Sequence, residues 1–228
     1  MRMRKKKHAD ERLERCSEFL TDAPAAVEDM PVFLEIGAGK GGFACGMCQQ
    51  HPDVRYYAME KVTDCVVLAA EKAKELYEKK GACVNLKFLI NTADNLTELF
   101  PKESVDRIFL NFSDPWSKKG YAKRRLTHRR YLAVYFNLLK DGGVLRFKTD
   151  NVGLFDFSLE EISAMGLSVR ILTRDLHNSE WAAGNVVTEY EAAFASQGVK
   201  INMLEVVKPV GFAPQIPDDL MPDRKRYR

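Results

Sequence analysis

The sequence lacks a long hydrophobic run. Its basic amino-terminal residues, among them Arg2 and Arg4, are not followed by an apolar stretch, so we expect neither a signal peptide nor a membrane span. The expected location is therefore the cytoplasm. The 228 residues, 46% of them hydrophobic, can bury the core of one large α/β domain but are few for two full domains.

Cysteine is scarce, and its pattern is not that of a disulfide framework. The five cysteines are odd in number and scattered over the first 83 positions, which predicts reduced thiols. Cys45 and Cys48 form a Cys-x-x-Cys pair, but no second pair at zinc spacing accompanies them. We predict that both pack in a helix and that there is no metal site, with redox or metal chemistry as the alternative.

A large excess of one charge is also absent. The 35 Lys and Arg are nearly balanced by 32 Asp and Glu, which gives a net charge of +3. Basic residues nevertheless gather at the first seven positions, at the carboxyl end, and between Lys118 and Arg130, where seven Lys or Arg occur without a carboxylate. Such clusters suit a polyanion, although the two terminal clusters are equally typical of solvated, disordered ends.

Apolar runs of strand length alternate with helical segments, which predicts a parallel sheet with crossover helices. The expected strands are residues 32–36, 54–59, 86–90, 105–109 and 143–147, and the expected helices are residues 42–50, 63–79, 93–100, 127–139 and 153–165. An amphipathic helix is expected over residues 10–20. Asp141, Gly142 and Gly143 indicate a sharp turn into the fifth strand.

The pattern changes after the last of these helices. Residues 167–173 and 187–195 both have the pattern of strands, with no long helix between them, and are expected to pair antiparallel. The chain shows no internal repeat or low-complexity linker. This organisation predicts a basic arm and helix over residues 1–30, a main domain over 31–208, and a proline-punctuated, basic tail over 209–228.

A glycine cluster follows the first predicted strand. Gly37, Gly39 and Gly42 satisfy a G-x-G-x-x-G pattern and let a ligand approach the backbone at a strand-to-helix turn. That pattern alone is weak evidence for any one ligand. A phosphate-binding loop of the Walker type is excluded, because Lys40 is followed by Gly41 rather than by Ser or Thr.

Acidic residues near this loop narrow the choice of ligand. Glu60 ends the second strand, where a carboxylate can accept the ribose hydroxyls of either NAD or S-adenosylmethionine. Glu35 favours the second ligand, because a carboxylate attracts a cationic methionine end and repels a pyrophosphate. Residues 91–95 form a polar cluster after the third strand that suits contact with adenine or the capping of the next helix.

The fourth predicted strand leads into residues 111–125, the most distinctive segment of the chain. Asp114 is expected at the end of this strand, beside the transferable methyl group. Pro115 stiffens the turn and Trp116 offers a broad apolar face, so that the three residues could shape a pocket for a base. The Lys and Arg residues that follow would hold phosphates around such a pocket.

Four ordered motifs resemble those of the tRNA (guanine-N7)-methyltransferase family and cover about residues 32–198. They are Leu34-Glu35-Ile36-Gly37, then Asp114-Pro115-Trp116-x-Lys118-Lys119 with Lys123-Arg124-Arg125, then Lys148-Thr149-Asp150, and finally Thr188-Glu189-Tyr190-Glu191. The resemblance implies an α/β, Rossmann-like class I methyltransferase fold with a mostly parallel seven-stranded sheet, a C-terminal antiparallel hairpin and helices on both faces. It also implies S-adenosylmethionine as cofactor and tRNA as partner, with the target guanosine in the variable loop.

The same resemblance, together with the glycine loop, assigns roles to individual residues. Contact with S-adenosylmethionine is expected from Glu35, Gly37, Gly39, Glu60, Thr92 and Asp114. Substrate contact is expected from Lys118, Asp150, Thr188, Glu189, Tyr190 and Glu191, and RNA contact from Gly120, Tyr121, Ala122, Lys123, Arg124 and Arg125. The chain departs from the family at two positions, because the family usually has Asp where Thr92 stands and often has His where Tyr121 stands.

Methylation of guanine N7 needs no base, because N7 already holds an in-plane lone pair, so the main task is positioning. Asp114, Asp150 and Glu191 are the candidates for stabilising the positive charge that develops on the purine. The alternative for Asp150 is a purely structural role, as a turn residue before Asn151. We expect a monomer or homodimer with no obligatory protein partner.

Three other functions remain open at this point. Ser113-Asp114-Pro115-Trp116 partly matches the Asp-Pro-Pro-Tyr type of motif of enzymes that methylate exocyclic amines, but lacks the second proline. The glycine pattern with Glu60 would also suit an NAD-dependent oxidoreductase. The basic clusters alone would suit a non-catalytic RNA-binding module.

Overall fold

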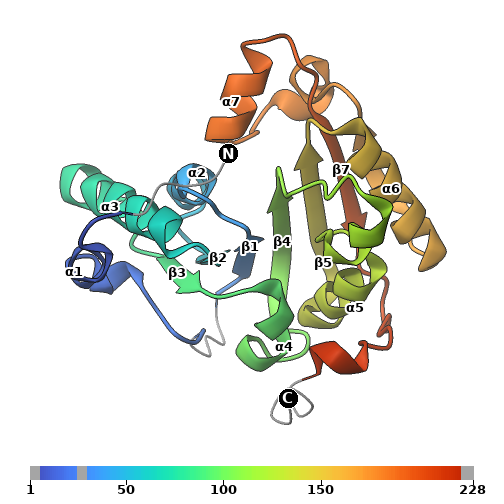
Figure 1. The fold of residues 1–228 in the computed structure, drawn as a ribbon, viewed down its shortest axis with the longest axis horizontal. Helices are drawn as coiled ribbons and strands as arrows, with labels where there is room; N and C mark the ends of the chain where they lie inside the picture. Colours follow the sequence, from blue (N-terminus) through green and yellow to red (C-terminus); the bar gives the residue numbers. More distant parts are fainter. Residues whose placement is uncertain (1–5, 25–29, 222–228) are drawn as a thin grey trace. The chain divides into compact units, whose positions relative to one another are not determined.

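The computed structural model describes residues 6–24 and 30–221. These residues fall into two compact units, an N-terminal unit within Met1–Thr92 and Val186–Thr188, and a C-terminal unit within Ala93–Asn185 and Glu189–Arg228. The strand order is β3-β2-β1-β4-β5-β7-β6 in a seven-stranded sheet (Figure 1). Strands β1 to β3 belong to the N-terminal unit and β4 to β7 to the C-terminal unit.

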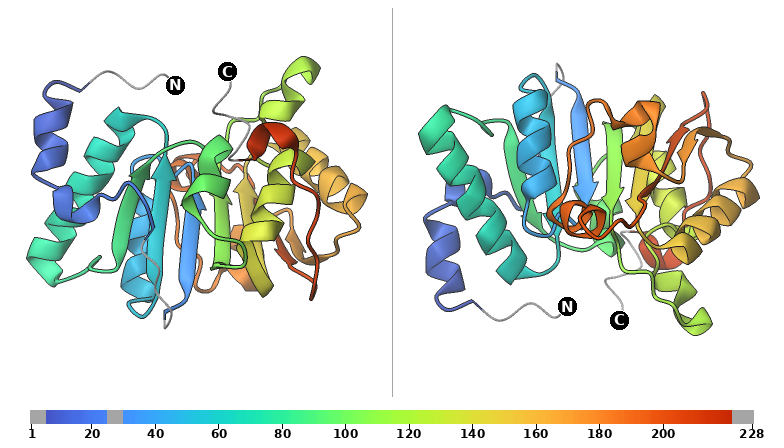
Figure 2. Two further views of the ribbon diagram at one scale, coloured as in Figure 1. Left: turned by 90° about the horizontal axis from the view of Figure 1, so that it is seen from below. Right: turned by 90° about the horizontal axis from the view of Figure 1, so that it is seen from above.

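The N-terminal unit is built on three parallel strands. They are β1 (Val32–Ile36), β2 (Arg55–Glu60) and β3 (Leu86–Ile90), and its helices are α1 (Ala9–Glu14), η1 (Ser17–Phe19), α2 (Gly42–Gln50) and α3 (Thr63–Lys80). Ile36 pairs with Met59, and Glu60 with Ile90, so the carboxyl ends of all three strands are level. Helices α2 and α3 contact each other and both contact β2 and β3, while α1 packs on α3 (Figures 1 and 2).

The C-terminal unit combines a parallel and an antiparallel pairing. Its strands are β4 (Val105–Asn111), β5 (Leu139–Thr149), β6 (Val169–Thr173) and β7 (Asn202–Val207), and its helices are η2 (Ala93–Asn95), α4 (Leu96–Leu99), η3 (Lys119–Arg124), α5 (Arg129–Leu138), α6 (Val152–Ala164), η4 (Leu176–Asn178), η5 (Glu180–Ala182), α7 (Glu189–Ala195) and η6 (Asp218–Leu220). Strand β4 runs parallel to β5, and β7 runs antiparallel to both β5 and β6. Helices α5 and α6 contact each other and β5 (Figure 2).

These observations confirm the predicted α/β class, with a mostly parallel sheet that ends in antiparallel strands. The prediction of a strand over residues 187–195 was wrong, because residues 189–195 form α7 and the antiparallel partner of β6 is β7. Ala192, Ala193 and Ala195 are strong helix formers, which outweighs the apolar content of this segment. Strand β7 was missed because its middle position is a charged residue, Glu205, which is 1% exposed.

Two other local predictions differ from the structure. Residues 141–143 were expected to form a turn before the fifth strand, but they lie within β5, where its pairing with β4 shifts register and Gly142 has a φ of 78°. The helix expected over residues 10–20 ends at Glu14 and is followed by η1.

No helix of the described segments is long and apolar enough to span a bilayer. Most of the basic residues predicted at the two termini lie outside the described residues. These are Arg2, Arg4, Lys5, Arg224, Lys225, Arg226 and Arg228.

Candidate functional site

The glycine loop after β1 is shaped by its backbone conformation. Gly37 has a φ of 83° and Gly39 a φ of 55°, values that other residues rarely adopt. A Cβ built on either glycine meets no described atom within 4 Å, so the space beside the loop is open. Gly41 is required for a different reason, because a Cβ there would lie 2.7 Å from the Cβ of Ala69 on α3.

Glu60 is tied to this loop by hydrogen bonds. Its Oε2 accepts from the Gly39 amide at 3.0 Å, and its Oε1 accepts from the Val62 amide at 2.9 Å. The carboxylate therefore stands at the carboxyl end of β2 with fixed orientation, and its second lone pairs remain available to hydroxyl donors. Thr92 follows β3 in the same unit, and its amide donates to Asn91 Oδ1 at 2.8 Å.

Glu35 lies deeper in the N-terminal unit. It is 2% exposed, and Tyr56 Oη donates to its Oε2 at 3.4 Å. Burial, reinforced by the Glu35 charge, raises the pKa of Tyr56 well above its ordinary value. Tyr56 therefore remains a neutral donor to a carboxylate that lies immediately before the glycine loop.

The turn after β4 holds strained backbone on both sides of Asp114. Phe112 and Trp116 have φ values of 51° and 41°, a left-handed conformation that costs about 1–3 kcal/mol for such residues and is found mostly at functional sites. Asp114 itself is exposed, and its carboxylate has no partner among the residues that the structure describes. The Ser113 hydroxyl is buried and, within the same described ranges, also lacks a hydrogen-bond partner.

Arg125 and Phe112 hold this turn in place. Arg125 donates from Nε to the Pro115 carbonyl at 2.9 Å and from Nη2 to the Trp116 carbonyl at 3.1 Å. Its guanidinium lies 4.3 Å from the centre of the Phe157 ring. The Phe112 amide donates to the Lys148 carbonyl at 2.9 Å, and its ring stacks on Phe194 at 6.3 Å. Arg125, predicted to contact RNA, therefore braces the turn that carries Asp114.

The other predicted RNA-contact residues lie on or next to η3. The Arg124 guanidinium lies over two aromatic rings, at 5.1 Å from Trp116 and 4.8 Å from Tyr121, which is itself 41% exposed. Lys118 and Lys123 are exposed, and their ammonium groups have no carboxylate partner in the described part of the chain. Gly120 and Ala122 contribute backbone to this short helix.

Asp150 follows β5 and is not the residue that caps α6. Asn151 makes that cap, because its Oδ1 accepts from the Leu154 amide at 2.8 Å. Over the segments that the structure describes, the Asp150 carboxylate makes no hydrogen bond or ion pair. The local structural role proposed as the alternative for Asp150 is therefore taken by the side chain of Asn151. The Asp150 carboxylate is available to a ligand.

Glu191 lies at the centre of a buried polar cluster. Its carboxylate, which is 0% exposed, accepts hydrogen bonds from Lys148 Nζ at 2.6 Å, Asn185 Nδ2 at 2.6 Å and His177 Nε2 at 2.7 Å. Burial alone would raise the pKa of Glu191, but the Lys148 ammonium and the other donors keep it below its ordinary value. The neighbours Glu189 and Tyr190 are exposed, whereas Thr188 is buried.

The sequence did not indicate that Lys148 and His177 contact Glu191. Lys148 and His177 lie 43 and 14 residues from Glu191, and no local spacing rule links such positions. The cluster attaches the start of α7 to the end of β5, next to Asp150.

The cysteine pair does not form a reactive site. Cys45 and Cys48 are buried in α2 as free thiols, and burial raises the pKa of Cys48 far above its ordinary value. Such thiols are poor nucleophiles and poor metal ligands. Within residues 6–24 and 30–221, no three His, Cys, Asp or Glu side chains gather closely enough to hold a metal ion.

Comparison with known proteins identifies the family of the chain. The profile of a family described as "Putative methyltransferase" matches residues 29–204. The chain is 40% identical to a tRNA (guanine-N(7)-)-methyltransferase of Bacillus subtilis over 90% of this chain and 98% of that protein. It is 45% identical to one of Lachnoclostridium phytofermentans over 76% of this chain and 79% of that protein.

A solved structure shows the same fold at low sequence identity. A 16S rRNA (adenine(1408)-N(1))-methyltransferase from Catenulisporales acidiphilia, with its cosubstrate S-adenosylmethionine, covers 92% of this chain and 96% of its own at a TM-score of 0.55 and 15% identity. This likeness confirms the Rossmann-like methyltransferase fold. From the family profile and the two relatives together, the chain belongs to the tRNA (guanine-N7)-methyltransferase family.

Proposed function

We propose that this protein transfers a methyl group from S-adenosylmethionine to N7 of a guanosine in tRNA. The observation that carries the proposal is the 40% identity to a tRNA (guanine-N(7)-)-methyltransferase over 98% of that relative. The same function is supported by the glycine loop, by the strained Asp114 turn and by the Asp150 carboxylate, which has no partner in the described part of the chain. We further propose that the target lies in the variable loop and that the reaction takes place in the cytoplasm.

The residues of the N-terminal unit fit S-adenosylmethionine. Gly37 and Gly39 leave open space beside the loop, and the fixed Glu60 carboxylate can accept from both hydroxyls of a ribose. Thr92 would lie near the adenine. The charge of Glu35, which is buried immediately before the glycine loop, would attract the cationic methionine end of the cofactor. When bound, S-adenosylmethionine supplies an electrophilic methyl group on a sulfonium.

The residues of the C-terminal unit would position the guanine and stabilise its charge. N7 needs no deprotonation, so a fixed pose is the main requirement. Asp150 has no partner among the residues that the structure describes and would accept from the N1 and N2 hydrogens of the base, which become more acidic as N7 acquires positive charge. Asp114, whose carboxylate also lacks a partner within the described ranges, is the second candidate for stabilising this charge. Lys118, Glu189 and Tyr190 are exposed and would complete the substrate contacts.

For Glu191 the proposal is a positioning role. Its charge is neutralised by Lys148, and its oxygens already accept three hydrogen bonds, so it is poorly suited to bind the base directly. It would instead hold the start of α7 against β5.

Incubation of undermodified tRNA with the protein and methyl-labelled S-adenosylmethionine, followed by nucleoside analysis, tests the proposal. The expected product is N7-methylguanosine. Label recovered in an N-methylated adenosine or cytidine would favour the exocyclic-amine alternative, and recovery of no labelled nucleoside would reject both.

A further inference from the structure

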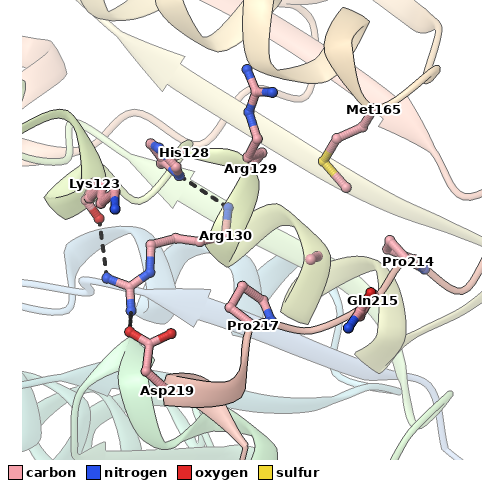
Figure 3. Close-up of a pocket in the computed structure, with 10 residues that line it drawn as sticks. Lys123, His128, Arg129, Arg130, Met165, Pro214, Gln215, Pro217 and Asp219 are labelled. Carbon is pink, nitrogen blue, oxygen red and sulfur yellow. Dashed lines mark hydrogen bonds and ion pairs between the residues drawn. The ribbon is translucent and has the colours of Figure 1, made fainter.

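A basic pocket lies in the C-terminal unit. It is a cavity of about 490 Å³ between the start of α5 and residues 214–219, and its lining includes Lys123, His128, Arg130, Met165, Pro217 and Asp219. In Figure 3 the Arg130 side chain extends between Lys123 and Asp219, and the apolar part of the lining comes from Met165 and from Pro214 and Pro217 of the segment that carries Asp219. Only Lys123 among these residues belongs to the stretch predicted to contact RNA.

The positive charge of the pocket comes from two side chains. The Lys123 ammonium has no carboxylate partner among described residues. Arg130 pairs through Nη2 with Asp219 Oδ2 at 2.6 Å and lies 4.9 Å from the Tyr131 ring. Arg129, by contrast, is committed to Glu161, to which it donates from Nε at 2.9 Å and from Nη2 at 2.8 Å.

The backbone amides at the amino-terminal end of α5 do not supply this positive charge. The Arg129 amide donates to Glu161 Oε2 at 2.6 Å, and the Arg130 amide donates to His128 Nδ1 at 3.1 Å. Burial lowers the pKa of His128, which keeps the imidazole neutral and able to accept that hydrogen bond at neutral pH. An anion in the pocket would therefore be bound by side chains.

The wall that carries Asp219 is fixed independently of Arg130. Asn137 Nδ2 donates to the Pro214 carbonyl at 2.7 Å, and Thr97 Oγ1 donates to the Leu220 carbonyl at 2.7 Å. The ion pair is also solvent-accessible, since the side chains of Arg130 and Asp219 are 20% and 57% exposed. An exposed pair of this kind contributes little stability, so Asp219 can be displaced from Arg130 without loss of the pocket.

We propose that this pocket binds a backbone phosphate of the substrate tRNA through Lys123 and Arg130, and that Asp219 competes with that phosphate for Arg130. A guanidinium binds phosphate in the same forked geometry as a carboxylate, so one acceptor can replace the other. The apolar lining residues Met165, Pro214 and Pro217 would pack against the ribose next to that phosphate. The inference rests on the proposed function in that it takes tRNA as the polyanion.

Because Asp219 and the phosphate would compete for Arg130, substitutions of Arg130 and Asp219 should change tRNA affinity in opposite directions. Arg130→Gln removes a phosphate ligand and is expected to weaken tRNA binding about fivefold and to reduce the steepness of its salt dependence by about one unit of log–log slope. Asp219→Asn removes the competitor and is expected to tighten tRNA binding. Binding would be measured by fluorescence anisotropy over a salt series, with S-adenosylmethionine affinity expected to be unchanged in both variants.

A matched control is the ion pair of Lys140 and Asp106, which are 2.9 Å apart. Lys140 lies at the start of β5 and does not line the pocket. Lys140→Gln changes the net charge by the same amount as Arg130→Gln and should leave the affinity for tRNA and its salt slope at the wild-type values. Thermal unfolding of each variant verifies that it is folded, and Lys123→Gln is the second test if Arg130→Gln is not.

Equal weakening of tRNA binding by Arg130→Gln and Asp219→Asn would overturn the proposal, because it would mean that the pair only supports structure. Unchanged salt slopes in both Arg130→Gln and Lys123→Gln would overturn it as well. These outcomes concern binding alone. Failure of the wild-type protein to form N7-methylguanosine would instead reject the proposed function, so that the two failures are separable.

Discussion

Arg125, which is predicted to contact RNA, also makes hydrogen bonds within the protein. It lies in a basic stretch, yet its guanidinium is bound to the carbonyls of Pro115 and Trp116. These contacts hold a turn in which two non-glycine residues have left-handed backbone. At the scale of single residues, the position of Asp114 therefore depends on Arg125.

Arg125→Ala should lower the single-turnover rate of methylation by about 100-fold, because displacement of a reacting group by about 1 Å has effects of that size. The affinity for tRNA should change much less, since the guanidinium is already committed to backbone. Arg124→Ala is the matched control and should show the reverse, with weaker tRNA binding and a nearly normal rate. A normal rate in Arg125→Ala together with weakened tRNA binding would contradict the bracing role and would favour the RNA contact predicted from sequence.

Asp150 allows a second test at this scale. Asp150→Asn keeps the size of the side chain but removes the charge that would stabilise the methylated purine, so the single-turnover rate should fall about 100-fold. Affinity for S-adenosylmethionine should be unchanged. Asp156 lies on α6, the helix that follows Asp150, and forms an exposed ion pair with Arg174. Asp156→Asn should leave the rate at the wild-type level. A normal rate in Asp150→Asn would remove this residue from the mechanism.

The candidate site was predictable where function depends on local spacing. The glycine loop, Glu60 and the Asp-Pro-Trp turn each follow a predicted strand, so their motifs could be located from sequence. Lys148, His177 and Asn185 could not be associated with Glu191, because their contact depends on how α7 and η4 pack on β5. Ile171, Leu176, Ile201 and Met203 form an apolar cluster against which Phe112 and Phe194 pack, and the four residues come from two segments, one on each side of α7 in the chain.

At the scale of elements, α7 is attached to β5 by the buried pair of Glu191 and Lys148. The pKa of Glu191 is lower in the folded protein than its ordinary value of 4.5. The pair therefore contributes stability that is fully present above that value and is lost as the pH falls through the folded pKa. Glu191→Gln leaves the Lys148 charge buried without its partner, which costs about 3 kcal/mol.

Denaturant unfolding should thus show Glu191→Gln to be about 3 kcal/mol less stable than the wild type near neutral pH. The difference should shrink as the pH falls below 4.5. A difference that stays constant over this pH range would mean that Glu191 is not ionised in the folded protein.

The fold was predictable where strands are continuously apolar. Strands β1 and β2 and helix α2 agree with the predicted segments to within one residue, because buried parallel strands are apolar on both faces. Strand β7 departs from this rule. Its buried Glu205 accepts from Arg146 on β5 and from Arg170 on β6. Two ion pairs across three strands thus replace the apolar side chain that a sequence pattern detects.

At the scale of the whole molecule, net charge is a poor guide to the partner. The net charge is only +3, but Lys118, Lys123, Arg124 and Arg130 lie in one short segment of the C-terminal unit. We expect tRNA affinity to fall with salt at a log–log slope of about −3 to −4, as for four phosphate contacts. A slope near zero over a salt series would show that these residues do not bind the RNA backbone.

The account's central claim concerns the atom that is methylated. Undermodified tRNA treated with the protein and S-adenosylmethionine, then with borohydride and aniline, is cleaved only where guanosine carries a methyl group on N7. We predict scission at a single guanosine of the variable loop, which should appear about 100-fold more slowly with the Asp150→Asn protein. Methylated tRNA that resists this cleavage would contradict the account.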